Sequence, residues 1–282
     1  MTTMQEFPPL PPATAATDVF ESGHLWIEEL IDGGPLRFRV TETGLIEFGD
    51  VECVFDPDAI PLRYRHAVRT IRDAFARDAF RHAVADVRSV TFFGVATDRH
   101  RIAYDLEETP AFLGSDVYDA ERGRFLSPDA TQRVFEHVGL VPIEPLSKEV
   151  RAVDVDPDAY AIPESSWYDG PAAGVVFRNK AGGRAVRRHP DLLVSPGSDR
   201  DAPEHGSEAL DALIAEHVSD EWMERIVEAC GEEPATVEGV VERALERLGR
   251  ETPLLAAEGG ASESDVRSLL VERADRYLRK RQ

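Results

Sequence analysis

The densest group of basic side chains in the chain falls within residues 178–188: Arg178, Lys180, Arg184, Arg187 and Arg188. Guanidinium and ammonium groups gathered in this way can bind the oxygens of phosphate groups. The segment also has the alternating pattern of two β-strands around a Gly-Gly turn, so the same side chains could instead form a solvated strand face. The sequence leaves both interpretations open.

A second segment that could do chemistry is EELIDGGPLRF, residues 28–38, where Asp32 precedes Gly33 and Gly34. A carboxylate beside flexible glycines can approach a ligand closely, but Asp-Gly is also a strong hairpin signal, and the turn is the favoured interpretation. Cys53 and Cys230 lie too far apart for a zinc motif, and the eight histidines show no metal-ligand spacing. The sequence therefore predicts no metal site.

Composition narrows the classes of function. The 282 residues carry a net charge of −21, and the only lysines are Lys148, Lys180 and Lys280. An acidic, lysine-poor surface suits solubility in concentrated salt, as in a halophilic, acidic proteome, and it opposes broad attraction to nucleic acid. The cysteine usage, the absence of a signal-peptide pattern and the absence of a long apolar run favour a cytoplasmic protein without membrane contact.

The elements that must position these residues can be read from periodicity and turn signals. Strands are expected at 24–31, 35–48, 89–96, 111–119, 174–179 and 183–190, and helices at 61–86, 128–139, 208–230, 235–248 and 262–281. This predicts an α+β fold with an extended arm at 1–18, a body at 19–194, a polar linker at 195–207 and a small helical domain at 208–282.

Five segments, in this order, resemble the motifs of ATP-dependent RNA ligases in the covalent nucleotidyltransferase superfamily: 28–38, 92–105, 110–126, 171–180 and 183–190. The resemblance spans about residues 20–192 and implies antiparallel sheets around a cleft. In that family a lysine of the first motif attacks the α-phosphate of ATP and forms lysine–AMP. Carboxylates bind the metal, an aromatic residue stacks the adenine, and lysines of the last motif stabilise phosphate charge. The AMP then passes to a 5′-phosphate end, and a 3′-hydroxyl displaces it.

This sequence departs from the family at the residues that carry the reaction. The nucleophile position holds Leu30, two glutamate positions hold Val95 and Ala173, and the first lysine of the last motif is Val186. An aromatic position holds Ser115, and two arginine positions hold Val51 and Cys53. These losses predict a degenerate member without catalytic residues. The remaining candidates for nucleotide or phosphate binding are Asp32, Gly33, Arg37, Asp116, Arg178, Lys180, Arg187 and Arg188.

Three hypotheses follow. The first is an inactive ligase-fold protein, a pseudoenzyme, that binds a nucleotide or RNA end, or a protein partner through its helical domain, and needs no cofactor. The second is an active ligase with rearranged residues, in which Lys180 is a relocated nucleophile and ATP with Mg²⁺ or Mn²⁺ is required. The third is an unrelated α+β protein. The first two require Leu30, Val95, Ala173 and Val186 to converge on one cleft.

Overall fold

The computed structural model describes residues 4–193, 207–231, 235–252 and 262–281. The chain divides into two compact units, one formed by Met1–Ile60 with Ala67–Ser195 and the other by Pro61–His66 with Pro196–Gln282. Residues 195–206 of the predicted linker lie outside the described residues, and residue 207 begins a helix. None of the described helices is long and apolar enough to cross a membrane.

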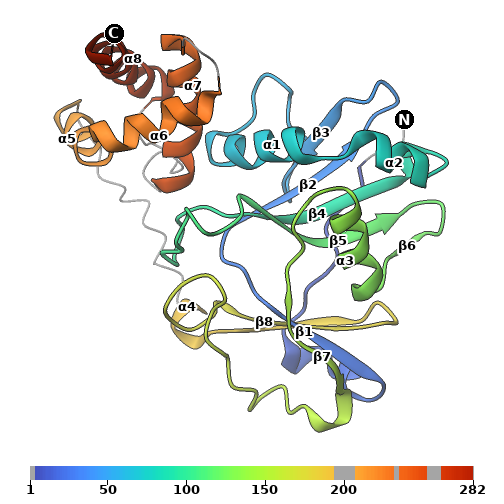
Figure 1. Cartoon of the computed structure of the whole chain (residues 1–282). Helices are drawn as coiled ribbons and strands as arrows, with labels where there is room; N and C mark the ends of the chain where they lie inside the picture. Colours follow the sequence, from blue (N-terminus) through green and yellow to red (C-terminus); the bar gives the residue numbers. More distant parts are fainter. Residues whose placement is uncertain (1–3, 194–206, 232–234, 253–261, 282) are drawn as a thin grey trace. The chain divides into compact units, whose positions relative to one another are not determined.

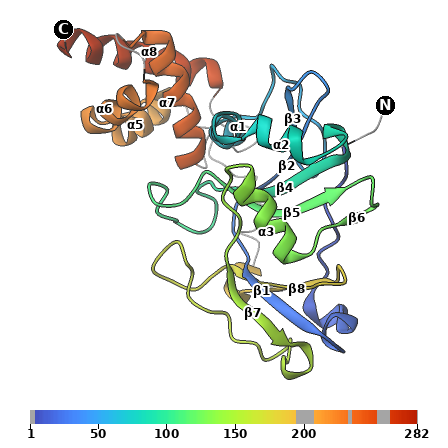
Figure 2. The same ribbon diagram turned by 45° about the vertical axis from the view of Figure 1, so that its right-hand side comes forward.

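Two antiparallel sheets form the frame of the first unit, and Figures 1 and 2 show them one above the other. Sheet A has the strand order β7-β1-β8-β9, and sheet B has the order β3-β2-β4-β5-β6. The predicted α+β class with antiparallel sheets is confirmed. The strands are β1 (His24–Glu29), β2 (Gly34–Val40), β3 (Ile46–Gly49), β4 (Val90–Ala96), β5 (Phe112–Asp119), β6 (Arg124–Phe125), β7 (Pro145–Arg151), β8 (Gly174–Asn179) and β9 (Arg184–Arg188).

The favoured interpretation of Asp32-Gly33 as a hairpin turn is wrong. Strand β1 pairs with β7 and β8 in sheet A, whereas β2 pairs with β3 and β4 in sheet B. Residues 30–33 therefore cross from one sheet to the other. The Asp-Gly signal is local and fits either geometry, because a glycine after an aspartate permits a sharp change of direction whether or not the flanking strands pair.

Helices and aromatic rings cover one face of sheet B. The helices are α1 (Leu62–Ala74), α2 (Arg77–Ala83) and α3 (Pro128–His137). The single helix expected at 61–86 is two helices, α1 and α2, and between them the Ala76 N–H donates to the Val138 carbonyl. Beneath them Phe38 stacks on Phe92 with ring centroids 4.8 Å apart. Side chains alternate between the faces of a strand, so the neighbours of these residues point to the opposite face.

Sheet A is likewise buried on one face, where an apolar core includes Leu25, Ile27 and Phe177. The N-terminal segment closes this core through two short 3₁₀ turns, η1 (Ala13–Ala15) and η2 (Thr17–Phe20). Further 3₁₀ turns, η3 (Val87–Ser89) and η4 (Ala152–Asp154), and the short helix α4 (Pro190–Leu193) complete this unit. Because successive side chains of a strand point to opposite faces, the other face of sheet A carries the polar residues of these strands, such as Glu28, Arg178 and Arg184.

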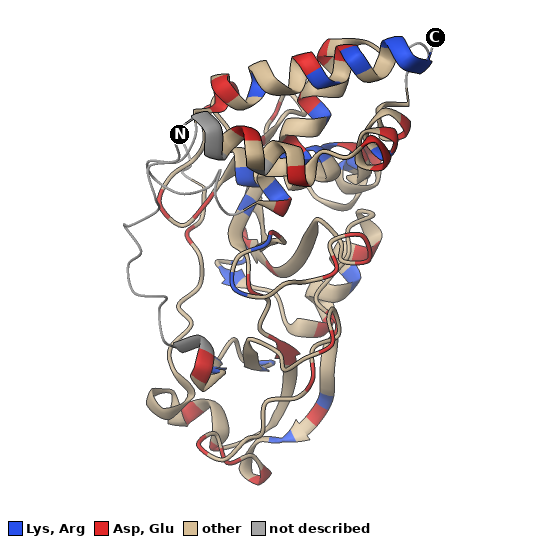
Figure 3. Cartoon of the chain, turned by 90° about the vertical axis from the view of Figure 1, so that its left-hand side faces the viewer, with Lys and Arg blue, Asp and Glu red and all other residues tan. Residues whose placement is uncertain are grey.

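The second unit contains the C-terminal helices α5 (Ser207–His217), α6 (Asp220–Cys230), α7 (Val237–Glu251) and α8 (Glu263–Arg281). The helix expected at 208–230 is two helices, because the Ser219 hydroxyl caps α6 by accepting from the Trp222 N–H. Figure 3 shows acidic and basic residues interspersed along these helices, with basic residues at the end of α8. Their buried faces form one apolar core that includes Trp222, Leu245 and Leu270.

Candidate functional site

A cavity of about 400 Å³ lies within the first unit, between the polar face of sheet A and the face of sheet B that the helices leave open. Strands β1, β8 and β9 supply one wall, and β2, β4 and β5 supply the other. The crossover at 30–33 forms one edge. Phe7, Pro8 and Leu10 of the N-terminal segment also line the cavity.

Three of the four positions that depart from the family's reactive residues meet at this cavity. Leu30, Val95 and Ala173 all line it and belong to, or pack against, one apolar cluster with Ile102 and Tyr104. Val186 is absent from the lining, although it shares a face of β9 with Arg184 and Arg188, which do line the cavity. Its N–H donates to the Pro11 carbonyl, so the N-terminal segment runs beside it.

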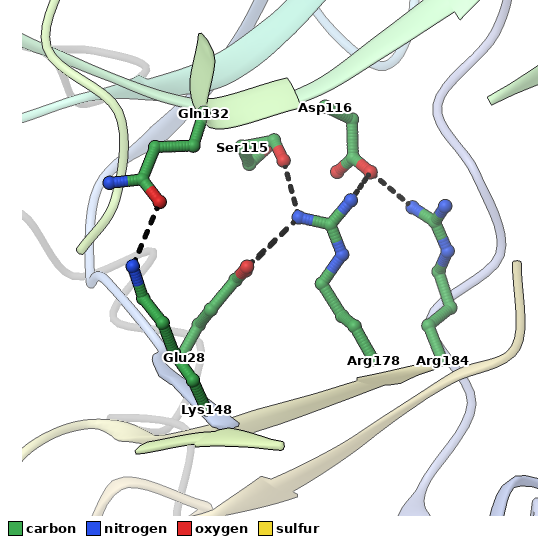
Figure 4. A network of polar contacts seen from close by, with 7 residues as sticks. All are labelled: Glu28, Ser115, Asp116, Gln132, Lys148, Arg178 and Arg184. Carbon is green, nitrogen blue, oxygen red and sulfur yellow. Dashed lines mark hydrogen bonds and ion pairs between the residues drawn. The ribbon is translucent and has the colours of Figure 1, made fainter. Parts of the chain in front are cut away.

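A buried network of charged side chains joins the two sheets at the cavity floor (Figure 4). The Arg178 guanidinium donates to Glu28 Oε1 at 3.0 Å, to Asp116 Oδ1 at 2.8 Å and to the Ser115 carbonyl at 2.7 Å. Arg184 donates to the same Asp116 oxygen at 2.8 Å. Arg178, Glu28 and Asp116 are each less than a tenth exposed, and they come from β8, β1 and β5.

The network sets the protonation of its members. Burial raises the pKa of Glu28, and the nearby Arg178 opposes this change without cancelling it. Burial acts to lower the pKa of Arg178, but the carboxylates of Asp116 and Glu28 outweigh it and raise that pKa. Taking charges out of water is costly, and hydrogen-bonded pairing offsets this cost. Both guanidiniums and both carboxylates are therefore committed to one another.

No lysine lines the cavity, and all three lysines lie in the part of the chain that the structure describes. Lys180 is half exposed and pairs with Glu149 at 2.7 Å, a contact that raises the pKa of the Lys180 amine. Lys148 donates to Gln132 Oε1 (Figure 4) and also lies over the Trp26 ring. Lys280 pairs with Asp220. A nucleophilic amine must be partly deprotonated, so the environment of Lys180 works against that role.

Asp32 is held by the loop that follows β4. Its Oδ2 accepts from the backbone N–H groups of Arg101 and Ile102 at 2.7 and 2.9 Å, and its Oδ1 lies 3.1 Å from His100 Nδ1. Burial acts to raise the pKa of Asp32, but these hydrogen bonds outweigh it and lower the pKa. Gly33 packs so closely that a Cβ would lie 2.5 Å from the Ala96 carbonyl oxygen.

The carboxylates of the cavity wall are the side chains that would bind the metal implied by the resemblance to RNA ligases. Those of Glu28, Glu29, Asp32 and Asp116 line the cavity, and each accepts hydrogen bonds from protein donors. For Glu29 the donors are the Ser165 hydroxyl at 2.6 Å and the Ser166 N–H at 2.8 Å. Among the described residues no group of three or more His, Cys, Asp or Glu side chains could hold a metal ion. These residues do not fit a divalent metal.

The structure separates the predicted phosphate-binding residues. Asp32, Gly33, Asp116, Arg178 and Arg188 line the cavity, whereas Arg37, Lys180 and Arg187 do not. Arg187 points to the other face of β9, where it donates to the Pro157 carbonyl, because successive strand residues face opposite sides. Arg37 lies buried beneath the N-terminal segment.

Several cavity residues had no individual prediction: Glu28, Glu29, Arg101, Arg184 and Phe7. Alternation along β1 was the available signal for Glu28, and the basic cluster already contained Arg184. Nothing in the local sequence marks Glu29, Arg101 or Phe7, because each reaches the cavity through a long-range contact.

Comparison with known proteins extends this picture. No family model matches the sequence, and no curated protein matches it. Among solved structures the chain is similar to a variant of the Naegleria gruberi RNA ligase with ATP and Mn, with a TM-score of 0.54 and 13% identity over 67% of this chain and 57% of the other. For the same ligase with PPi the TM-score is 0.53 at 13% identity, over 70% and 59%.

The likeness concerns shape, since so few residues are shared. The matched regions make up a little over half of each ligase chain. Two antiparallel sheets lie around a cavity here, and the crossover at 30–33 joins them. The chain thus has a fold like that of the RNA ligase structures that it matches.

Proposed function

We propose that this protein is an RNA ligase-fold pseudoenzyme that binds a nucleotide or a phosphorylated RNA end without transferring AMP. This proposal rests on one observation, namely which residues line the cavity. Leu30 occupies the position where the family has its nucleophile, and all three lysines of the chain lie elsewhere. A covalent lysine–AMP intermediate requires an amine within bonding distance of the α-phosphate, and this cavity provides none.

The electrostatics of the cavity support the same conclusion. Val95 and Ala173 add apolar surface where the family has carboxylates, and the four remaining carboxylates are engaged by protein donors. Phosphoryl transfer depends on groups placed to neutralise the charge that develops on the phosphates. Recruiting these carboxylates for that purpose would require breaking hydrogen bonds that already stabilise the fold.

Binding without chemistry remains compatible with the cavity. Arg188 is exposed and lines the cavity, and no described residue pairs with its guanidinium. Arg184 lies two residues away on the same face of β9 and lines the cavity while it stays paired with Asp116. A guanidinium is well suited to a phosphate, and the apolar surface of Leu30, Val95 and Ile143 offers contact for a base or ribose.

We also propose a role for each of the two regions of the chain. The α+β region at 19–194 would carry the ligand, and the helical region at 208–282 would provide the surface for a protein partner. The acidic, lysine-poor composition would suit a cytoplasm with concentrated salt.

The decisive experiment is incubation with α-³²P-ATP and Mg²⁺ or Mn²⁺ at high salt, followed by denaturing electrophoresis. We expect no labelled protein band. A labelled band would refute the proposal, and its loss in the Lys180→Ala variant would favour an active ligase with a relocated nucleophile.

Calorimetry with AMP tests the binding half of the proposal. We expect Arg188→Gln to weaken AMP binding by about tenfold, because one charge-assisted contact contributes on the order of 1.4 kcal/mol. The matched control is Arg133→Gln, since the Arg133 side chain is 70% exposed and does not line the cavity. Absence of AMP binding to the unmodified chain would contradict a nucleotide-binding role.

A further inference from the structure

Residues 4–10 of the N-terminal segment cover a part of sheet B that carries a buried arginine and an aromatic ring, Arg37 and Phe93. Residues 4–10 cross sheet B and lead to the Pro11 contact with β9 in sheet A, along the dark blue trace between the two sheets in Figure 1. Within the described residues this segment makes a single hydrogen bond, from Arg37 Nη1 to the Gln5 carbonyl at 2.8 Å. A segment with few contacts of this kind opens at low free-energy cost.

Arg37 is poorly satisfied beneath this cover. Its side chain is 5% exposed, its Nε has no hydrogen-bond partner, and no described carboxylate lies within ion-pair distance. Burial lowers the pKa of Arg37, and the carboxylate of Glu6 is the largest influence that opposes this change. A guanidinium offers five N–H donors, so a buried arginine with one hydrogen bond keeps donors that an anionic group could accept from.

Aromatic rings continue from Arg37 across the same face. On the paired strands Phe93 lies opposite Arg37, and its ring centroid is 5.5 Å from that of Phe125. The Arg184 guanidinium lies 4.8 Å from the centre of the Phe125 ring. Arg37, Phe93, Phe125 and Arg184, here called the aromatic strip, therefore place two aromatic rings between two guanidiniums.

The N-terminal segment presents to this strip the groups that a nucleotide would present. The Gln5 carbonyl accepts from Arg37, Glu6 supplies a negative charge, and the Phe7 ring packs edge-on against Phe93 with centroids 5.1 Å apart. Removal of the segment would uncover the Phe93 ring and remove the Glu6 charge. Stacking rings beside cationic side chains are the features with which proteins bind single-stranded nucleic acid.

We propose that the aromatic strip is a binding site for single-stranded RNA, and that residues 4–10 occupy it until an RNA strand displaces them. A base stacks on Phe93 in place of Phe7, and the neighbouring phosphate takes the donors of Arg37. The inference rests on the proposed function, because it supplies the path by which an RNA strand reaches the cavity. Arg37, Phe93 and Phe125 do not line the cavity, so the strip can be tested separately through Arg37 and the segment that covers it.

The test is fluorescence anisotropy of a labelled, 5′-phosphorylated oligoribonucleotide of about eight nucleotides with the full chain over a KCl series. Phe7→Ala weakens the cover and leaves the strip intact, so RNA binding is expected to strengthen about threefold or more. Glu6→Gln changes binding in the same direction without touching the packing. Leu45→Ala, at an exposed leucine in the turn before β3, is the matched control and leaves binding unchanged.

Arg37→Gln is expected to weaken binding about fivefold and to reduce the slope of log affinity against log salt by about 0.7. Arg133→Gln is its control for lost charge, and a thermal melt of each variant verifies folding. RNA binding that is unaffected by Phe7→Ala, Glu6→Gln and Arg37→Gln would overturn the inference. Binding of an acidic peptide, but not of RNA, to the Phe7→Ala chain would also overturn it.

AMP binding to the unmodified chain separates the two proposals. If AMP binds while RNA binding is insensitive to the changes at the strip, the aromatic strip is wrong and the proposed function stands. If AMP fails to bind while Phe7→Ala strengthens RNA binding, the nucleotide cavity is wrong and the strip stands.

Discussion

Replacing Arg178 by methionine tests whether the buried network holds the two sheets together. The Arg178 guanidinium donates to Glu28, Asp116 and the Ser115 carbonyl. Its removal leaves Glu28 buried without a hydrogen-bonded cation, whereas Asp116 keeps Arg184. Removing one partner of a buried ion pair costs about 3–5 kcal/mol, so we expect the free energy of unfolding of the sheet unit to fall by that amount.

A double variant distinguishes the loss of the Glu28–Arg178 ion pair from the cost of burying an unpaired charge. Glu28→Gln together with Arg178→Met leaves no uncompensated charge in this part of the network. The loss of unfolding free energy in the double variant should therefore be smaller than the sum of the losses in the two single variants. The difference, which is the coupling free energy, should be about 1 kcal/mol or more. Purely additive effects would mean that the two side chains do not act as a pair.

The pKa of Glu28 determines how the stability difference between wild type and Arg178→Met changes with pH. Burial raises the pKa of Glu28 above its ordinary value of 4.5, so ionisation of this carboxyl is less favourable in the folded state than in the unfolded state. The resulting penalty is absent below 4.5 and grows as the pH rises through the folded pKa. Loss of Arg178 raises this pKa further. The stability gap between wild type and Arg178→Met should therefore widen as the pH rises above 4.5.

Urea unfolding followed by tryptophan fluorescence measures these free energies. A Trp222→Phe background leaves Trp26 and Trp167, which both lie in the sheet unit. Arg133→Met, at a side chain that is 70% exposed, controls for the loss of a cation. An Arg178→Met protein within about 0.5 kcal/mol of wild type, or a gap that does not change with pH, would refute the reasoning.

Three further changes test other parts of the fold and site. Asp32→Asn removes the negative charge to which the amides at 101 and 102 donate, so we expect faster hydrogen exchange in the loop 97–106 and a loss of about 1–3 kcal/mol. Hydrogen bonds outweigh burial and lower the pKa of Asp32. The extra stability of aspartate over asparagine is therefore present above pH 3.8 and is lost as the pH falls through the folded pKa. Unchanged hydrogen exchange at neutral pH would contradict this prediction. Gly114→Ala places a Cβ 2.4 Å from the Phe135 ring and should cost about 1–3 kcal/mol, and an unchanged melting temperature would argue against this packing. Leu30→Lys alone should yield no lysine–AMP with labelled ATP, because the cavity carboxylates are already engaged; a labelled band would show that the remaining groups suffice.

Local patterns predicted most elements because periodicity depends on near neighbours. The strands around β4, β5 and β8 and the helix α3 lie where alternation and helical spacing placed them. The short strand β6 and the charged strand β7 escaped prediction, since neither has an apolar face that alternates clearly. Helix ends were misplaced where a long-range contact intervened, as at Ala76.

The residue at a reactive position is a property of sequence alone. A leucine at position 30 has no nucleophilic atom in any fold, so the hypothesis of lost chemistry needed only the motif order. The tertiary structure decided which side chains meet. Strands β1 and β2 separate into different sheets, Lys180 lies away from the cavity, and the N-terminal segment covers Arg37. Pairing of distant strands depends on the total burial of both sheets and on closing long loops, and neither can be read from a local stretch of residues.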